Sequence, residues 1–141
     1  MRSRSKSREA ALKALYSLEL SKEVSGDGAS ELAEKTLLSV DPDNPLKKGV
    51  LEYAVLIVEG VITELDELDK LIEECSTNWS VDRMAVVDKN ILRLAASELR
   101  QTDTPYKVVM DEAIELSKKY GTDESRSFIN GVLDKLVKIV K

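Results

Sequence analysis

Histidine is absent from this 141-residue chain, and cysteine occurs only once, at Cys75. The commonest general base and the commonest transition-metal ligand of proteins are therefore missing. One cysteine cannot form an internal disulfide, and without histidine it cannot complete a structural zinc site. We expect a protein with no cofactor and no metal, working in a reducing compartment such as the cytoplasm.

Proline, glycine and long apolar runs are also scarce. The chain has three prolines and six glycines, and the apolar run 54–58 is far too short to span a bilayer. The basic N-terminus is not followed by the apolar segment of a secretory signal, so we expect no membrane association. With 43% hydrophobic and 33% charged residues, the composition fits one soluble domain covering residues 1–141.

Apolar residues recur at helical spacing almost throughout, and no segment alternates with the period of a β-strand. The predicted fold class is therefore all-α. Breaks at glycine, proline and acid-rich positions divide the chain into expected helices at about 5–20, 30–38, 46–75, 83–99, 105–120 and 123–140. The third is expected to bend or break near residues 63–66.

Three local features refine these helices. Ser30 is a candidate N-cap of the second helix, and Thr104 of the helix that Pro105 opens. Gly131 lies inside the last helix, where glycine costs about 1 kcal/mol relative to alanine. We therefore expect Gly131 to permit a close approach between two helices.

Negative charge dominates the chain except at its start. The net charge is −5, yet the first eight residues carry Arg2, Arg4, Lys6 and Arg8 and no acid, so the rest sums to −9. This basic arm, residues 1–8, can neutralise phosphates whether it is extended or continues the first helix. The arm indicates a polyanionic partner such as RNA, although a solubilising tail without a ligand explains the same charges equally well.

Two of the six aromatic residues are candidates for RNA contact. Tyr16 lies two turns from Arg8, and Phe128 lies near the start of the last helix. Bases of single-stranded RNA commonly stack on aromatic rings beside arginine and lysine. The alternative, that both side chains belong to the core, is the commoner arrangement.

The sequence offers no catalytic arrangement. It contains no phosphate-binding loop, and no serine has a histidine to activate it. The acids are spaced as on a solvated helix face. We therefore expect that this protein is not an enzyme.

Three blocks of sequence carry a resemblance to a known family. They are the arm followed by REAALKALY (8–16), NILRLAASEL (90–99), and TPYKVVMDEAIELSKKYG (104–121) leading into FINGVLDK (128–135). The chain resembles the NusB family of bacterial transcription antitermination factors over nearly its whole length. The last block is highly specific, whereas residues 22–78 match only in helical pattern.

The resemblance implies a fold and partners. The fold would be a single compact domain made of two small helical bundles with about seven helices. The partner would be NusE, a ribosomal protein, and the pair would bind the single-stranded boxA element of ribosomal RNA leader transcripts. The complex would act on elongating RNA polymerase, which then reads through terminators.

The resemblance also implies site residues. The family's basic RNA contacts fall on Arg4, Lys6 and Arg8 within the arm that begins at Arg2, and its base-contacting aromatics fall on Tyr16 and Phe128. An acidic position associated with function falls on Glu124.

Two other arrangements stay open from the sequence. One is a helical protein–protein scaffold whose arm never touches RNA. The other is a homodimer that buries the RNA surface.

Overall fold

The computed structural model describes residues 3–21, 28–77 and 79–140. Within these residues the chain forms seven α-helices, one short 3₁₀ helix (η1) and no strand, which confirms the predicted all-α class. The elements are α1 (Ser3–Ser21), α2 (Ala29–Val40), α3 (Lys48–Thr63), α4 (Leu65–Cys75), η1 (Val81–Arg83), α5 (Val86–Gln101), α6 (Tyr106–Tyr120) and α7 (Ser125–Val140).

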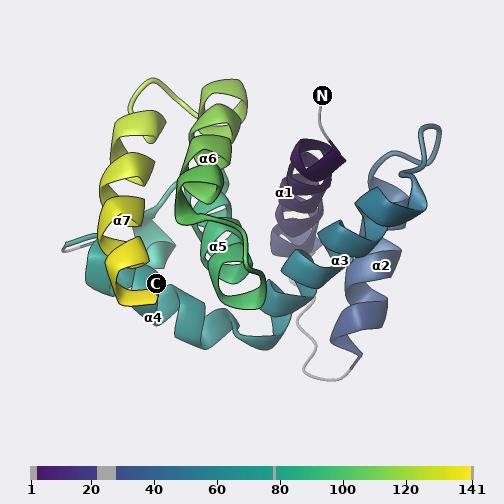
Figure 1. Ribbon diagram of the computed structural model, residues 1–141, viewed down its shortest axis with the longest axis horizontal. Helices are drawn as coiled ribbons and strands as arrows, with labels where there is room; N and C mark the ends of the chain where they lie inside the picture. Colours follow the sequence, from purple (N-terminus) through teal and green to yellow (C-terminus); the bar gives the residue numbers. More distant parts are fainter. Residues whose placement is uncertain (1–2, 22–27, 78, 141) are drawn as a thin grey trace.

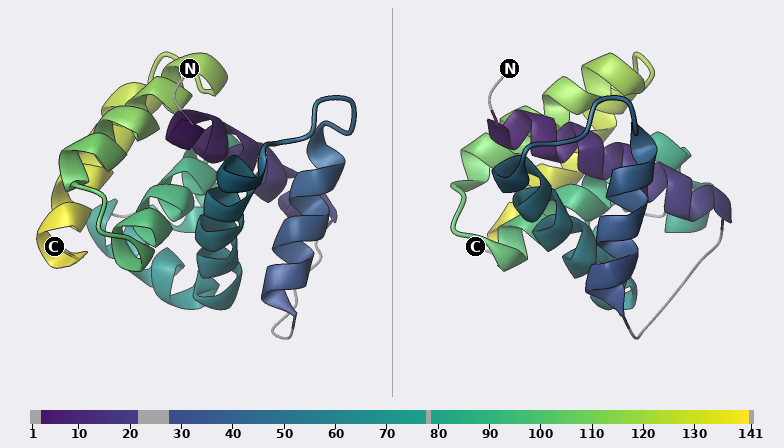
Figure 2. Two further views of the ribbon diagram at one scale, coloured as in Figure 1. Left: turned by 45° about the vertical axis from the view of Figure 1, so that its right-hand side comes forward. Right: turned by 90° about the vertical axis from the view of Figure 1, so that its right-hand side faces the viewer.

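The helices pack as two bundles that meet along α5 (Figure 1). Helices α1, α2 and α3 pack against one another on one side, and α4, α5, α6 and α7 on the other. Helix α5 also packs against α1 and α3, so it belongs to the interface as well as to its own bundle. The turned views in Figure 2 show α1 lying across the junction between the bundles. The two-bundle fold is therefore confirmed.

One hydrophobic cluster contains buried side chains from all seven helices. Its members follow helical spacing, as with Ala11, Leu12 and Leu15 of α1, because one face of each helix is turned inward. Helix α5 is exceptional, since every residue from Lys89 to Leu99 is buried. No helix in the described part of the chain is long and apolar enough to cross a membrane.

The predicted break in the long third segment is confirmed. Helix α3 ends at Thr63, α4 begins at Leu65, and the N–H of Glu64 between them donates to the carbonyl of Gly60 at 3.1 Å. The chain therefore breaks at the acid-rich residues, while Val61 and Leu65 on either side still pack on the core.

Both predicted caps are wrong in position. Helix α2 is capped by Gly28, whose φ of 73° is left-handed and suits glycine, so Ser30 lies inside the first turn. Helix α6 is capped by Pro105 rather than Thr104. The hydroxyl of Thr104 lies 3.0 Å from the hydroxyl of Tyr53. It is therefore engaged in a tertiary contact rather than in capping α6.

Gly131 does not permit a close helix approach, and that expectation is wrong. It is exposed, and a Cβ placed on it would meet nothing within 4 Å. The close approach occurs at buried Gly60 of α3, where a Cβ would collide with the hydroxyl of Ser97 and come within 2.9 Å of Gln101 on α5. The Ser97 hydroxyl also donates to the carbonyl of Ile57 at 2.7 Å, which fixes it beneath the glycine.

Alanine should therefore have opposite effects at the two glycines. Gly131→Ala should raise the free energy of unfolding by about 1 kcal/mol, because alanine is the better helix former in open space. Gly60→Ala should lower it by about 1–3 kcal/mol, because the added methyl overpacks the α3–α5 contact. Urea unfolding followed by circular dichroism measures both; equal effects would contradict this description of the interface.

Candidate nucleic-acid interface

Residues 3–8 of the basic arm form the first part of α1 rather than an extended tail. Helix α1 starts at Ser3, so Arg4, Lys6 and Arg8 lie on helical turns, while Arg2 lies outside the described residues. Arg4 and Lys6 are exposed, but Arg8 is only 4% exposed. The structure therefore separates the arm into two surface cations and one interior cation.

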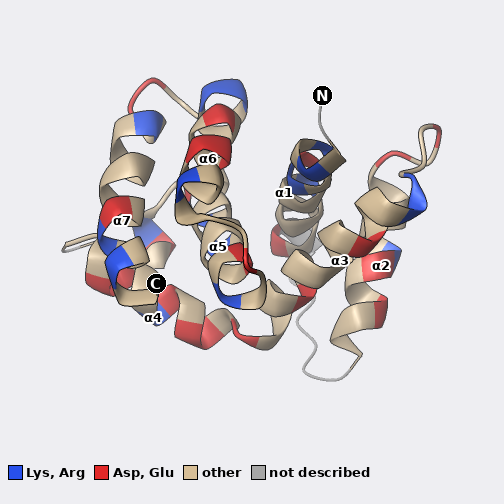
Figure 3. Cartoon of the chain, viewed as in Figure 1, with Lys and Arg blue, Asp and Glu red and all other residues tan. Residues whose placement is uncertain are grey.

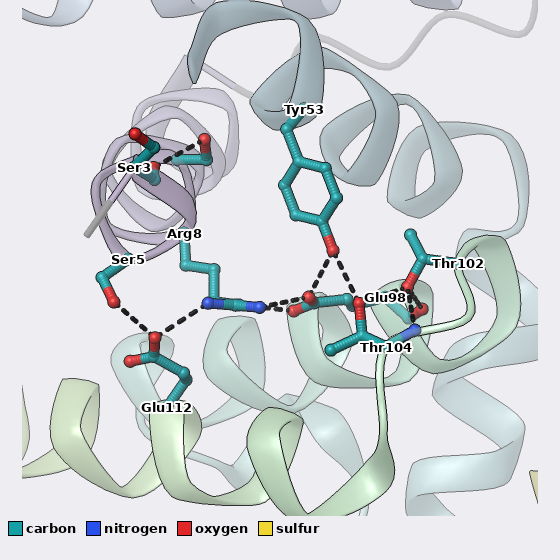
Figure 4. Close-up of polar contacts among 9 residues, drawn as sticks. Ser3, Ser5, Arg8, Tyr53, Glu98, Thr102, Thr104 and Glu112 are labelled. Atoms are coloured by element: carbon teal, nitrogen blue, oxygen red, sulfur yellow. Dashed lines mark hydrogen bonds and ion pairs between the residues drawn. The ribbon is translucent and has the colours of Figure 1, made fainter. Parts of the chain in front are cut away.

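Arg8 is held by two carboxylates in the space between the bundles (Figure 4). Its Nε and Nη2 donate to the two oxygens of Glu98 on α5 at 2.8 and 2.6 Å. Its Nη1 donates to Glu112 on α6 at 2.8 Å, and the Ser5 hydroxyl donates to the same carboxylate. Because all three guanidinium nitrogens pair with carboxylates and the residue is almost fully buried, Arg8 is not placed as a surface contact for phosphate.

Tyr53 of α3 completes the network (Figure 4). Its hydroxyl donates to Oε2 of Glu98 at 2.5 Å, and its ring lies beneath the exposed guanidinium of Arg4, 3.7 Å from Cζ to the ring centre. The Cζ of Arg8 lies 6.0 Å from the same ring centre. Cation–π attraction therefore holds Arg4 over a ring whose position depends on Glu98.

The balance of forces on Arg8 favours its charged state. Burial alone would lower the pKa of Arg8, but the hydrogen bond and charge of Glu98, with the further charge of Glu112, raise its pKa above the ordinary value. The expectation that Arg8 joins a surface cation cluster is corrected accordingly. Its spacing from Ala11, Leu12 and Leu15 places it on the buried stripe of α1.

Surface cations from other helices lie near the start of α1 (Figure 3). The first turns of α1, the last turn of α6 and the first turn of α7 lie along one edge of the molecule, with α6 in the middle. Basic residues mark all three, and acidic residues mark the connection between α6 and α7. Lys119 of α6 pairs with Glu9 of α1, and the hydroxyl of Tyr120 donates to Glu9 at 2.6 Å. We call the exposed Arg4, Lys6, Lys118, Lys119 and Arg126 the basic edge.

Tyr16 borders a groove next to this edge. The side chain is 44% exposed, and the groove has a volume of about 330 Å³. Its lining comes from α1, α5 and α6 and comprises Leu12, Lys13, Tyr16, Val87, Asn90 and Tyr120. Tyr16 is therefore placed where a flat ligand can reach it, and it is not a core residue.

Phe128 and Glu124 lie at the start of α7. Phe128 is partly buried and packs against the hydrophobic cluster, and it does not line the groove of Tyr16. Glu124 is exposed, and its carbonyl accepts the N–H of Phe128 at 3.1 Å. The two predicted aromatic sites are thus separate features of the surface.

A second buried network fixes the other end of α1. Arg93 of α5 donates to both oxygens of Asp69 at 2.8 and 2.9 Å and to Glu19 of α1 at 3.0 Å. Lys89 pairs with the other oxygen of Glu19 at 3.0 Å. Burial raises the pKa of Glu19, but the hydrogen bond and charge of Lys89, followed by Arg93, lower its pKa overall.

Comparison with known proteins decides the family. The NusB family model matches residues 5–138. The transcription antitermination protein NusB of Anaeromyxobacter dehalogenans is 45% identical over 133 residues, covering 94% of this chain and 89% of that protein. This chain belongs to the NusB family. It is thus a relative of transcription antitermination factors, as its sequence blocks had indicated.

Solved structures agree with this NusB-family assignment. The NusB of T. maritima superposes with a TM-score of 0.83 at 37% identity, covering 96% of this chain and 90% of that one. A NusB chain crystallised with NusE and double-stranded RNA superposes with a TM-score of 0.82 at 30% identity, covering 99% and 98%.

Sequence reasoning missed three residues of this NusB-family surface. Lys118 and Lys119 lie in the last turn of α6, and Tyr53 is a buried residue of α3; no sequence pattern singled them out. Only packing brings the lysines beside α1 and the tyrosine beneath Arg4. The spacing of Glu98 from Leu94 and Ala95 was an available signal, since it places a carboxylate on a buried stripe opposite Arg8.

Removing Arg8 should destabilise the protein far more than removing its exposed neighbour. Arg8→Ala leaves Glu98 as an unpaired buried charge, so we expect the free energy of unfolding to fall by about 3–5 kcal/mol. Lys6→Ala is the control and should change it by less than about 0.5 kcal/mol. Urea unfolding measures both, and similar values would show that Arg8 is not a structural residue.

Acid should weaken the link between α1 and α5. The folded-state pKa of Glu19 lies below the ordinary value of 4.5, so its contribution is complete above that pH and is lost as the pH falls through the lowered pKa. The unfolding free energy of Glu19→Gln, measured from pH 7 to pH 3, should therefore depend less on pH than that of the unchanged protein. Parallel curves would contradict this account.

Proposed function

We propose that this chain is an RNA-binding adaptor of transcription antitermination that assembles with a NusE-type ribosomal protein. Family membership gives the process, and the similar NusB chain that was solved with NusE and double-stranded RNA gives the kind of partners. The observation that carries the RNA contact here is the basic edge, where three helix ends bring cations together on an otherwise acidic chain.

Arg4 and Lys6 are the proposed centre of the phosphate contact. Both are exposed on a helix that is anchored by Arg8, so their spacing is set before RNA arrives. Arg2, two residues before Arg4 in the sequence, is a further proposed phosphate contact, although it lies outside the described residues. Arg8 takes a positioning role, because its pairing with Glu98 and Glu112 holds the basic turn of α1 against α5 and α6.

Tyr16 and Phe128 are the proposed stacking positions for bases. Tyr16 is exposed, and Phe128 is a partly buried residue that also packs on the core. Glu124, exposed one turn before Phe128, would orient the RNA or NusE by repulsion or hydrogen bonding at the start of α7.

The particular RNA element and the target of the complex are proposed from the sequence resemblance. We propose that the RNA is a single-stranded boxA-type element of ribosomal RNA leaders and that the assembled complex acts on elongating RNA polymerase. The acidic remainder of the chain suits a basic ribosomal partner, since complementary charge speeds encounter and sets orientation. The chain contributes binding and no catalysis in this proposal.

The salt dependence of RNA binding tests the basic edge. In the double variant Arg4→Ala, Lys6→Ala, the negative slope of log K against log salt should become shallower by about 1.4, because each single-strand phosphate contact contributes about −0.7. The control is Lys70→Ala, Lys138→Ala, which removes the same charge from exposed positions on α4 and the last turn of α7. A labelled boxA RNA and a scrambled RNA are titrated with and without NusE.

The outcomes of this titration distinguish the RNA-binding adaptor from the protein–protein scaffold and from the occluded homodimer. Preference for boxA that tightens with NusE, with a slope reduced only in the Arg4, Lys6 variant, supports the adaptor. Equal slopes in both double variants would show general charge attraction. Partner binding without any RNA effect would favour the protein–protein scaffold, and a dimer that dissociates before RNA binds would favour the occluded homodimer.

A further inference from the structure

Asn90 of α5 has an amide nitrogen without a hydrogen bond. The residue is 2% exposed, and its Oδ1 accepts from Nη1 of Arg93 at 3.1 Å. Its Nδ2 is buried and has no partner in the described part of the chain. The orientation of the amide is fixed, because guanidinium nitrogens only donate and a flipped amide would set a donor against a donor.

A buried donor without an acceptor calls for an explanation, since nearly all such groups are paired in native proteins. Asn90 is one of the residues that line the groove of Tyr16. Asn90 therefore lies at the boundary between the core and a surface groove, and its unpaired Nδ2 is itself covered. A ligand in the groove that carries an acceptor would complete its hydrogen bonding.

The groove has the shape and lining for one flat heterocycle. Its volume of about 330 Å³ is at the small end of ligand sites. Leu12 and Val87 supply apolar contact, and Tyr16 and Tyr120 supply aromatic surface. Lys13 brings a cation to the same lining, and Tyr120 directly follows Lys119 of the basic edge.

We propose that this groove binds one base of the RNA held at the basic edge, with the base against Tyr16 and a base carbonyl accepting from Nδ2 of Asn90. The inference rests on the proposed function and adds a specificity-determining residue to it. Because Nδ2 is buried, the proposed contact requires groove side chains to shift when the base enters, and the exposed Lys13 is one that can do so while Tyr16 stays against the base.

The chemistry of the amide decides which bases fit. Because Oδ1 is engaged by Arg93, Asn90 offers only a donor. The proposal turns the O4 edge of uracil or the O6 edge of guanine toward Nδ2. On that edge cytosine and adenine carry an amino group, which would face Nδ2 donor to donor. The groove should therefore favour uridine over cytidine and guanosine over adenosine at one position of the RNA.

The first measurement uses the unchanged protein. The side-chain amide of Asn90 is followed by nitrogen–proton correlation spectroscopy while boxA RNA is added, and the exposed Asn44 serves as the reference. The Asn90 resonances should shift on binding, and a series of RNAs with one uridine replaced by cytidine should contain one that no longer shifts them. Resonances that stay in place throughout would overturn the groove assignment.

The second measurement uses Asn90→Asp. This variant keeps the oxygen that Arg93 needs but replaces the donor by an acceptor, so the preference for uridine should disappear or reverse at the identified position. For the unchanged protein we expect a preference of roughly two- to tenfold, the value of one hydrogen bond. Asn44→Ala is the matched control, and thermal unfolding confirms that each variant is folded.

Failure of this inference is distinguishable from failure of the proposed function. If the unchanged protein binds RNA with the expected salt slope while Asn90→Asp keeps the full preference, only the groove assignment is wrong. If Asn90→Asp does not fold, Tyr16→Leu is measured in its place. An unaltered preference for uridine in Tyr16→Leu would also overturn the proposal that a base binds in the groove. If no RNA binds in a salt-dependent way, both proposals fall together.

Discussion

The buried pairing of Arg8 with Glu98 is the interaction on which the rest of the structure depends. Removing two charges from water is costly, and the cost is met only where every polar atom finds a partner. Here Glu112 and Tyr53 supply the remaining partners, so four helices converge on one cluster (Figure 4). An apolar contact could hold the same helices together, but it would tolerate sliding that a paired guanidinium does not.

This constraint gives α1 its role in the molecule. Arg8 fixes the helix to α5 through Glu98, and Glu19 fixes it again through Lys89 and Arg93. Both attachments lie on α5, the helix whose central residues are all buried. Arg4 and Lys6 of the basic edge, together with Tyr16, therefore stand on a helix that is attached near both ends to the buried α5, so their relative positions follow from one helix packing on another.

The sequence allowed the fold to be predicted well because its information is local. Helical periodicity located the elements, and the acids near Glu64 located the break between α3 and α4. The site was predicted less well because counting the charges of residues 1–8 ignores which face of a helix each one occupies. Arg8 shares a stripe with Leu12 and Leu15, whereas Lys6 does not, and that difference separates an interior cation from a surface one. The cations of α6 could not be placed beside α1, since their proximity arises only from tertiary packing.

The helical state of the arm has a consequence for entropy. Ordering a residue of flexible chain costs about 1–2 kcal/mol, and a disordered basic tail would bear that cost each time it bound. Arg4 and Lys6 stand instead on a helix that is already formed when the core forms. The RNA association that we propose at this surface would thus be a docking on ordered groups rather than a coupled folding event, and it would leave the helical content of the described residues unchanged.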